Sequence, residues 1–238
     1  MTRVLITRPL EDAEPLAARL RALGHAVLIE PLLEIVPLEH PLPDLKQFQA
    51  LLFTSANGVR AFVRSSESRA LPVFAVGRAT ADTAIRSGFS IVSSADGDVE
   101  ALAGLVIARC RPAAGALLQI AATERAGDLA GRLAAAGFVV RRDVRYEARP
   151  ATALSPATVA ALAAGEVGAV LLFSPRTARA LTRLLAAAGL VAAARGVTAV
   201  CLSDAVAAAA DCPWRALEVA ARPDLEALLE RLGASPRL

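Results

Sequence analysis

Short apolar runs alternate with amphipathic segments along the whole chain. Runs typical of buried strands lie at Val4–Thr7, His25–Glu30, 50–53, 72–76, 89–92, 115–120, 138–146, 169–173, 197–202 and 215–220. Apolar residues three or four positions apart predict helices near 56–65, 79–87, 98–109, 125–136, 156–164, 175–188, 204–210 and 223–232, besides a first helix that stops at Gly24. This alternation predicts an α/β protein with parallel sheets.

Proline and glycine mark the ends of several predicted helices. Ser155-Pro156 and Ser174-Pro175 each combine an N-cap residue with proline at the first helical position. In the last helix we expect Pro223 in the first turn and Gly233 at the C-terminal end. These residues define helix boundaries that periodicity alone leaves open.

An internal repeat relates distant parts of the chain. The Leu, Leu and Gly at positions 16, 20 and 24 recur at 129, 133 and 137, and Phe53-Thr54-Ser55 recurs as Phe173-Ser174-Pro175. The first match aligns the N-terminal part with the end of the middle segment, and the second aligns the middle segment with the C-terminal third. Both hold if one domain is inserted into the other. We therefore predict a split domain, residues 1–33 and 150–238, and an inserted domain, residues 38–146.

Two segments connect these predicted domains. Glu34–His40 is followed by further prolines, and Arg141–Pro150 has the pattern of an edge-like strand, so both linkers are expected to be extended. Paired linkers predict a hinge and a cleft. Ligands of open parallel sheets bind beyond the carboxyl ends of the strands, so we expect strand-end residues to line this cleft.

Composition limits the classes of partner. Apolar residues make up 55% of the 238 residues, which predicts an ordered globular protein. Lys and Arg number 26 against 23 Asp and Glu, and Arg carries almost all of the positive charge. Most arginines are expected to be solvated, although their planar fork suits carboxylate or phosphate groups. No basic run interleaved with aromatic residues occurs, so nucleic acid is not expected as a partner.

Other features concern compartment and metals. The longest uncharged apolar run, Leu184–Ala194, is shorter than the ~18–20 residues of a membrane span, so no membrane association is expected. Cys110, Cys201 and Cys212 lack metal-ligand spacing and predict reduced thiols in a cytoplasmic protein. The two histidines have no cluster of Cys or carboxylate residues around them, so no metal site is expected. No long apolar stripe suggests an interface, and we expect a monomer.

The run FTSANGVRAF, from Phe53 to Phe62, has the most informative local pattern. An apolar run stops at small hydroxyl residues and gives way to a helical pattern, and FSPRTARAL repeats this from Phe173. A helix N-terminus that follows a strand presents N–H groups and the positive end of the helix dipole, which favour anions. The chain has no GxSxG, HExxH, GxxxxGK[ST] or similar motif, so an enzyme of this kind would work mainly by positioning its substrate.

Six motifs in order then indicate a family. VLITRP, FTSANGVRAF, AVGRATADTA, the single Tyr in the returning linker, FSPRT and CLSDAVA together resemble the uroporphyrinogen-III synthase family over nearly the full chain. The resemblance implies two flavodoxin-like parallel-sheet domains, one inserted into the other, joined by a two-stranded linker. It also implies conversion of hydroxymethylbilane to uroporphyrinogen III through a spiro intermediate, with inversion of the last ring and release of water. Neither a cofactor nor a metal is implied, and the substrate would arrive by transient handover from hydroxymethylbilane synthase.

The resemblance extends to individual residues. The cleft tyrosine of the family matches Tyr146, whose phenol, with an ordinary pKa of about 10, would help the hydroxyl leave. The alternative is a linker tyrosine that packs with its hydroxyl in solvent. The positions expected to bind substrate lie at the strand ends: Thr7, Arg8, Thr54, Ser55, Asn57, Gly58, Gly77, Arg78, Ser174, Arg176, Thr177 and Ser203.

A structural role is the alternative for most of these positions. The hydroxyl residues are also typical helix caps, and Arg176 would look the same as a solvated helix residue. Gly77 suits either a close approach of the backbone to a ligand or a simple strand-to-helix turn. After the strand at 115–120, many relatives have a polar pair where this chain has Ala121-Ala122, which weakens the expectation of substrate contacts there.

Two other classes of function remain alternatives. A non-catalytic hinged binding protein or sensor would close on a small polyanionic ligand. A two-domain transferase for a nucleotide-sugar would need a glycine-rich phosphate loop and a ribose-binding carboxylate, and the sequence contains neither signal. Conversion of hydroxymethylbilane, followed by separation of product isomers I and III, distinguishes all three classes.

Overall fold

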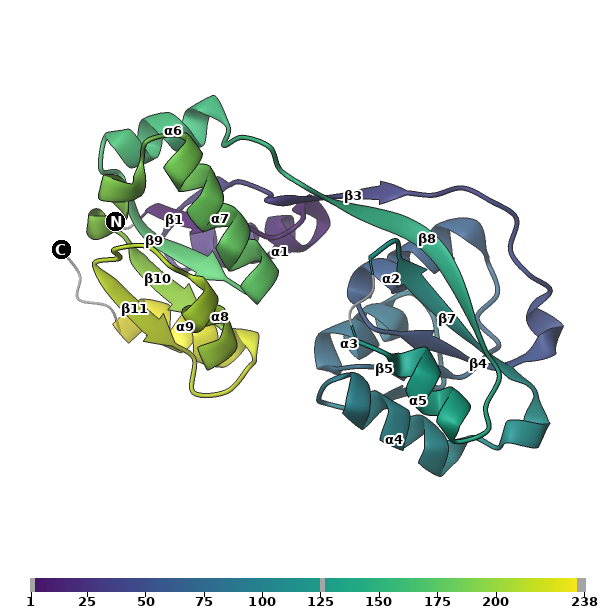
Figure 1. Cartoon of the computed structure of the whole chain (residues 1–238). Helices are drawn as coiled ribbons and strands as arrows, with labels where there is room; N and C mark the ends of the chain where they lie inside the picture. The colour runs from purple at the N-terminus through teal and green to yellow at the C-terminus, as the bar shows by residue number, and fades with distance from the viewer. Residues whose placement is uncertain (1–2, 125–126, 235–238) are drawn as a thin grey trace. The chain divides into compact units, whose positions relative to one another are not determined.

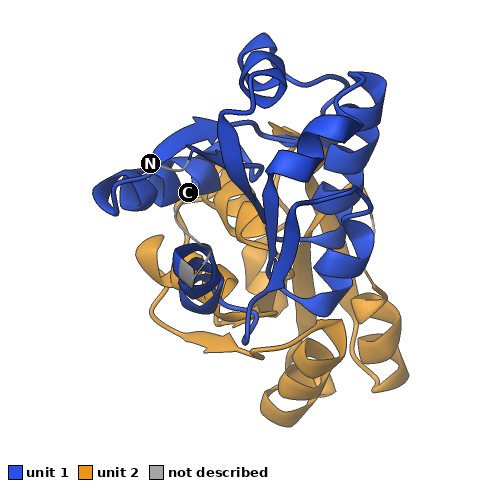
Figure 2. Ribbon diagram, turned by 90° about the vertical axis from the view of Figure 1, so that its left-hand side faces the viewer, with its two compact units in different colours: residues 1–34, 149–238 blue, residues 35–148 orange. Residues whose placement is uncertain are grey.

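The computed structural model describes residues 3–124 and 127–234. The chain divides into two compact units: unit 1 comprises Met1–Glu34 and Arg149–Leu238, and unit 2 comprises Ile35–Ala148 (Figure 2). Unit 2 is thus inserted, in sequence, between the two segments of unit 1.

Unit 1 contains a five-stranded sheet with the order β11-β10-β9-β1-β2, in which the pairings are parallel (Figure 1). Its strands are β1 (Arg3–Ile6), β2 (Ala26–Ile29), β9 (Val167–Leu172), β10 (Thr198–Cys201) and β11 (Ala216–Val219). Its helices are α1 (Leu10–Ala22), α6 (Pro156–Ala163), α7 (Pro175–Ala187), α8 (Asp204–Ala209) and α9 (Leu225–Ala234), with a 3-10 helix at Val191–Gly196. Leu20 of α1 and Leu228 of α9 share one core cluster, whereas Leu162 of α6 and Leu181 of α7 share another. Helices therefore cover both faces of the sheet.

Unit 2 contains a six-stranded sheet with the order β3-β8-β7-β4-β5-β6. Its strands are β3 (Leu33–Pro37), β4 (Phe48–Phe53), β5 (Val73–Ala75), β6 (Val92–Ser94), β7 (Ala116–Ala122) and β8 (Val140–Pro150). Its helices are α2 (Ala56–Ser65), α3 (Arg78–Arg86), α4 (Val99–Arg109) and α5 (Leu129–Ala135), with 3-10 turns at Leu45–Gln47 and Pro112–Ala114. Phe62 of α2 packs in one core cluster, and Leu102 of α4 and Leu133 of α5 pack in the other.

The two sheets correspond strand by strand, which explains the repeat in the sequence. The order β2-β1-β9-β10-β11 of unit 1 matches the order β8-β7-β4-β5-β6 of unit 2. In both, a strand-helix-strand element lies beside three further parallel strands, but this element comes first in unit 1 and last in unit 2. Unit 1 has the 2-1-3-4-5 order of flavodoxin-like sheets, and the matching strands of unit 2 have the circularly permuted order 5-4-1-2-3. Ligands of doubly wound sheets bind at the point where the strand order reverses. The predicted α/β fold with parallel sheets is confirmed.

The segment predicted as the second linker lies within β8. β3 lies on one side of β8 and β7 on the other, and the register between β7 and β8 ends at Tyr146. The prediction of an edge-like strand is therefore wrong for residues 144–146 and is not contradicted for residues 147–150. Leu38 N–H donates to Arg145 O at 2.8 Å and continues the pairing with β8 beyond the end of β3. The predicted limits of the domains and of the first linker stay predictions.

Helix ends differ from expectation in two places. The last helix begins at Leu225, because Asp224 Oδ1 accepts from Ala227 N–H at 2.8 Å, and it continues through Gly233. Pro223 therefore precedes the helix. Part of the helix predicted at 125–136 lies outside the described residues at 125–126, and α5 begins after Asp128, whose Oδ1 accepts from Gly131 N–H.

Candidate functional site

The turn between β4 and α2 is shaped by Ser55. Its backbone is extended, with φ −160° and ψ 157°, and its Oγ accepts from Gly58 N–H at 3.3 Å. This N-cap bond satisfies one of the free N–H groups at the start of the helix. The carboxyl end of β4 lies between those of β7 and β5, so Ser55 is at the point where the strand order reverses.

Tyr146 lies at the same edge of this sheet. It is on β8, only 6% exposed, and its phenolic oxygen lies 2.7 Å from Ser55 Oγ. The two residues are brought together across β7, where the partner of Tyr146 in register is Ala122. The alternative of a linker tyrosine with its hydroxyl in solvent does not hold.

The remaining predicted residues of unit 2 take different roles. Asn57 Oδ1 accepts from Arg60 Nη1 at 2.8 Å. A Cβ on Gly58 would lie 3.2 Å from Ile120 O, so glycine there allows α2 to pack closely on β7. Arg78 has an 81% exposed side chain 3.6 Å from the carboxylate of Asp96.

Gly77 differs from Gly58. It is the N-cap of α3 with an extended φ of −160°, and an added Cβ would meet nothing within 4 Å. Neither backbone conformation nor packing inside the protein requires glycine at this strand end. The close approach of a ligand at Gly77 stays a prediction.

The second turn, between β9 and α7, repeats the first. Ser174 has φ −151° and ψ 152°, and its Oγ accepts from Thr177 N–H at 3.1 Å. Its hydroxyl also lies 2.8 Å from Thr177 Oγ1. The guanidinium of Arg8 stacks 4.6 Å from the ring centroid of Phe173 and pairs with Asp12 at 3.2 Å. Arg8 is thereby held beside the second turn, as a predicted site residue on the neighbouring strand end.

Two further hydroxyl residues of unit 1, Thr7 and Ser203, differ in their hydrogen bonds. Thr7 is fully buried, and its Oγ1 donates to Leu171 O at 3.0 Å, so it holds β1 to β9 in place of the predicted contact with a ligand. Ser203 is the N-cap residue of α8, but its side chain makes no cap hydrogen bond. The role of a helix cap, which was the alternative for Ser203, is therefore absent. Thr54 and Arg176 are half-buried at their respective turns.

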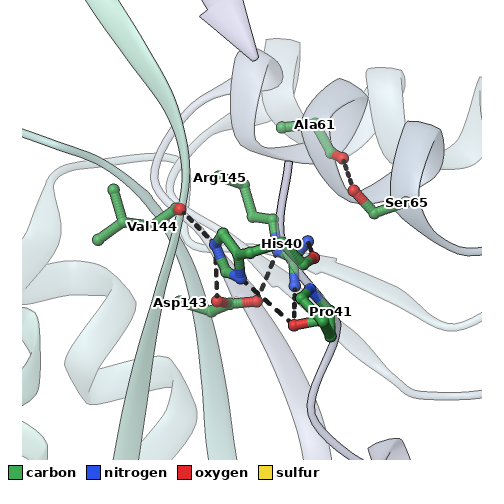
Figure 3. Close-up of polar contacts among 7 residues, drawn as sticks. All are labelled: His40, Pro41, Ala61, Ser65, Asp143, Val144 and Arg145. Carbon is green, nitrogen blue, oxygen red and sulfur yellow. Dashed lines mark hydrogen bonds and ion pairs between the residues drawn. The ribbon is translucent and has the colours of Figure 1, made fainter. Parts of the chain in front are cut away.

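A buried cluster on β8 was missed by the sequence reasoning (Figure 3). Arg145 is 1% exposed, and its Nε donates to Asp143 Oδ2 at 2.7 Å. Its two terminal nitrogens donate to His40 O at 2.5 Å and to Pro41 O at 3.0 Å. The His40 ring bonds Val144 O at 2.8 Å and lies 3.5 Å from Asp143 Oδ1. Arginine and aspartate two positions apart on a strand share one face, which is the signal that the sequence contained.

This cluster borders a cavity of about 820 Å³ within unit 2. The lining includes Leu38, His40, Ala61, Arg64 and Arg145. Because Arg145 is bonded to two backbone carbonyls and a carboxylate, its role in the cavity wall is to hold the segment after β3 against β8. The predicted site residues do not line this cavity.

The cysteines are free thiols. Burial raises the pKa of Cys201 to about 11 and also raises the pKa values of Cys110 and Cys212. A raised pKa opposes formation of the nucleophilic thiolate. Within residues 3–124 and 127–234, no group of three or more His, Cys, Asp or Glu side chains could hold a metal ion. No helix in the described part of the chain is long and apolar enough to cross a membrane.

The sequence matches a family model described as uroporphyrinogen-III synthase HemD over residues 14–230. The chain belongs to the uroporphyrinogen-III synthase family. The uroporphyrinogen-III synthase of Chlorobaculum parvum is 34% identical over 101 residues, which cover 38% of this chain and 41% of that protein. The porphyrin biosynthesis protein HemD of Ruminiclostridium josui is 33% identical over 76 residues, which cover 29% of this chain and 15% of that protein. The matches thus span about two fifths or less of the length of these relatives.

Solved structures of the same family share the fold. The uroporphyrinogen-III synthetase of Helicobacter pylori aligns over 100% of both chains with a TM-score of 0.65 and 19% identity. A mutant uroporphyrinogen III synthase of Thermus thermophilus aligns over 98% of both chains with a TM-score of 0.57 and 18% identity. At these identities the similarity concerns the fold alone, and it agrees with two doubly wound units joined through β3 and β8.

Proposed function

We propose that the chain cyclises hydroxymethylbilane to uroporphyrinogen III, with inversion of the last pyrrole ring and loss of water. This is a cyclising hydro-lyase reaction of tetrapyrrole biosynthesis. The observation that carries the proposal is the phenol of Tyr146, hydrogen-bonded to Ser55 at the switch point of the unit 2 sheet, in a chain that belongs to this family.

In the proposed first step, Tyr146 gives its phenolic proton to the terminal hydroxyl of hydroxymethylbilane. The carbon–oxygen bond breaks, water leaves, and an electrophilic azafulvenium cation remains while the tyrosine becomes a phenolate. The substituted carbon of the last ring then attacks, which gives the spiro intermediate. Rearrangement and ring closure release one proton, which returns to the phenolate. An acid at this position is useful because hydroxide is a poor leaving group at neutral pH.

We assign the strand-end turns to the carboxylates of the substrate. Hydroxymethylbilane bears an acetate and a propionate on each ring, and helix N-termini favour such anions. Ser174, Thr177 and Arg8 supply hydroxyl and guanidinium groups at the turn after β9. Thr54 and Gly77 supply the corresponding positions after β4 and β5, where the bare backbone of Gly77 gives a carboxylate room to reach N–H groups.

Positioning is the main task of such a site. The azafulvenium can close unaided to the uninverted isomer I, so the protein must hold the chain in the geometry that favours attack by the substituted carbon. We propose that this requires neither a cofactor nor a metal. We also propose that the chain acts as a cytoplasmic monomer and receives its labile substrate directly from hydroxymethylbilane synthase.

The test is the identity of the product isomer. Hydroxymethylbilane made enzymatically is incubated with purified protein that has been treated with EDTA, and the products are oxidised and separated. We expect isomer III. If treated protein yields only isomer I, as the substrate does alone, the proposed function is wrong.

A further inference from the structure

The capping serines Ser55 and Ser174 differ in the side chain that their hydroxyl contacts. Both residues have extended backbones and accept an N–H hydrogen bond from the first turn of their helices. The hydroxyl of Ser174 pairs with Thr177 Oγ1, an ordinary neighbour within the cap, at 2.8 Å. The hydroxyl of Ser55 pairs instead with the phenol of Tyr146, which lies 91 positions away in the sequence. A comparison of the two repeated turns therefore shows that the hydrogen bond to a distant tyrosine occurs in unit 2 and not at the equivalent serine of unit 1.

We propose that Ser55 is a positioning residue for Tyr146: it accepts from Gly58 N–H, shares a hydrogen bond with the phenol, and donates to the phenolic oxygen when that oxygen is ionised. This inference rests on the proposed function for the role of Tyr146, but the hydrogen bond itself can be tested without substrate. Ser55 would then act through Tyr146 and not through a contact with a substrate carboxylate.

The protonation state of Tyr146 sets the direction of its hydrogen bond with Ser55. Gly58 N–H can only donate, so it occupies one of the two lone pairs of Ser55 Oγ. While Tyr146 is protonated, either hydroxyl can donate across the 2.7 Å between the two oxygens. A phenolate oxygen can only accept, so Ser55 becomes the donor once the phenolic proton has left.

The same arrangement stabilises the phenolate that forms when the proton leaves. A hydrogen bond to an ionised oxygen is about twice as strong as one to a neutral oxygen. Ser55 is also the N-cap of the ten-residue helix α2, where the dipole favours negative charge. Tyr146 is 6% exposed, so water contributes little to the solvation of the phenolate, and hydrogen bonds inside the protein matter more there than they would in water.

The single tyrosine of the chain makes a direct test available. The ultraviolet absorbance of ionised tyrosine, followed during an alkaline titration, reports on Tyr146 alone. In Ser55→Gly, the midpoint of this titration should rise by about one to two pH units, because a hydrogen bond to a charged group is lost. Glycine is chosen because it replaces serine at an N-cap with little loss of helix stability. Circular dichroism at each pH verifies that the protein is folded.

Two matched variants identify the hydroxyl as the cause. Ser55→Thr retains a hydroxyl at the cap and should restore the midpoint of the unsubstituted protein. Ser174→Gly removes the equivalent cap in unit 1 and should leave the midpoint of Tyr146 unchanged. If Ser55→Gly has the same midpoint as the unsubstituted protein, or if Ser174→Gly shifts it equally, Ser55 does not stabilise the phenolate and the inference is overturned.

Kinetics provide a second test that does not depend on alkaline pH. If Ser55 acts through Tyr146, Ser55→Gly alone should lower kcat. The same substitution added to Tyr146→Phe should lower kcat little further. Independent multiplication of the two effects would instead place Ser55 on the substrate and contradict the inference. Should the unsubstituted protein form no isomer III, the proposed function fails, and the absorbance titration still decides whether Ser55 positions Tyr146.

Discussion

Replacement of Tyr146 by Phe should separate chemistry from structure. Phenylalanine keeps the ring, which is 6% exposed, and removes only the oxygen 2.7 Å from Ser55 Oγ. Loss of one positioned acid lowers turnover by about 10²–10⁴-fold. We expect the lower end, because the hydroxyl of the substrate leaves readily and the positioning turns remain intact.

The stability change is too small to imitate this effect. Loss of one hydrogen bond between neutral groups costs about 0.5–1.5 kcal/mol of unfolding free energy, against a typical total of about 5–15 kcal/mol. At least about 3.5 kcal/mol would remain, which keeps more than about 99% of the molecules folded, since each 1.36 kcal/mol is a factor of about ten. A hundredfold fall in kcat would therefore be catalytic.

Steady-state kinetics with hydroxymethylbilane and a urea unfolding curve, measured on the same preparation, test this prediction. We expect a lower kcat, a KM within a few-fold of that of the unsubstituted protein, and an almost unchanged folded fraction. Equal turnover in Tyr146→Phe and in the unsubstituted protein would mean that the phenol of Tyr146 has only a structural role. A loss of activity that only follows the loss of folded protein would have the same meaning.

Three further predictions concern stability and reactivity. Asp143→Ala leaves the buried guanidinium of Arg145 without its carboxylate and should lower the unfolding free energy, measured in urea, by about 3–5 kcal/mol. Glu100→Ala removes an exposed ion pair and should lower it by under about 1 kcal/mol. Equal losses in the two variants would contradict the importance of burial. Burial raises the pKa of Cys201 to about 11, so an aromatic disulfide reagent at neutral pH should modify it only after unfolding, and fast reaction of the native protein at Cys201 would refute this. Hydrogen bonds from Ala101 N–H and Glu100 N–H lower the pKa of Asp98, so the stability that Asp98 contributes is present above its ordinary pKa and is lost as the pH falls through the lowered value. Asp98→Asn should reduce the loss of unfolding free energy at acidic pH. An unchanged dependence on pH would show that Asp98 does not cause this loss.

Local signals predicted the helices and the turns because their causes lie within a few residues. The caps at Ser55, Ser155 and Ser174 each accept from an N–H three positions further on, so the sequence contains both partners. The parallel sheets followed from alternation, and the insertion followed from two matches that only one arrangement satisfies. The start of the last helix was predicted too early, because Asp224 caps the helix and Pro223 precedes it. Proline is compatible with a first helical turn but does not fix where the helix begins.

Contacts between distant segments could not be predicted in this way. The strand-end position of Thr7 was correct, but its burial depends on the hydroxyl reaching Leu171 O on a neighbouring strand. The Ser55–Tyr146 bond depends on the register of three neighbouring strands, β4, β7 and β8. A pattern of residue types indicates which groups reach one edge of a sheet, but not which pairs meet there.

The function proposed for this chain requires that it direct ring closure and not merely bind a polyanion. Hydroxymethylbilane closes by itself to isomer I at a fixed rate, so catalysis competes with a constant background. The most direct measurement is the ratio of isomer III to isomer I as the protein concentration is raised at fixed substrate. We predict a ratio that rises in proportion to protein concentration until isomer III is the only product. A binding protein would slow the formation of isomer I without producing isomer III, and that result would contradict the account.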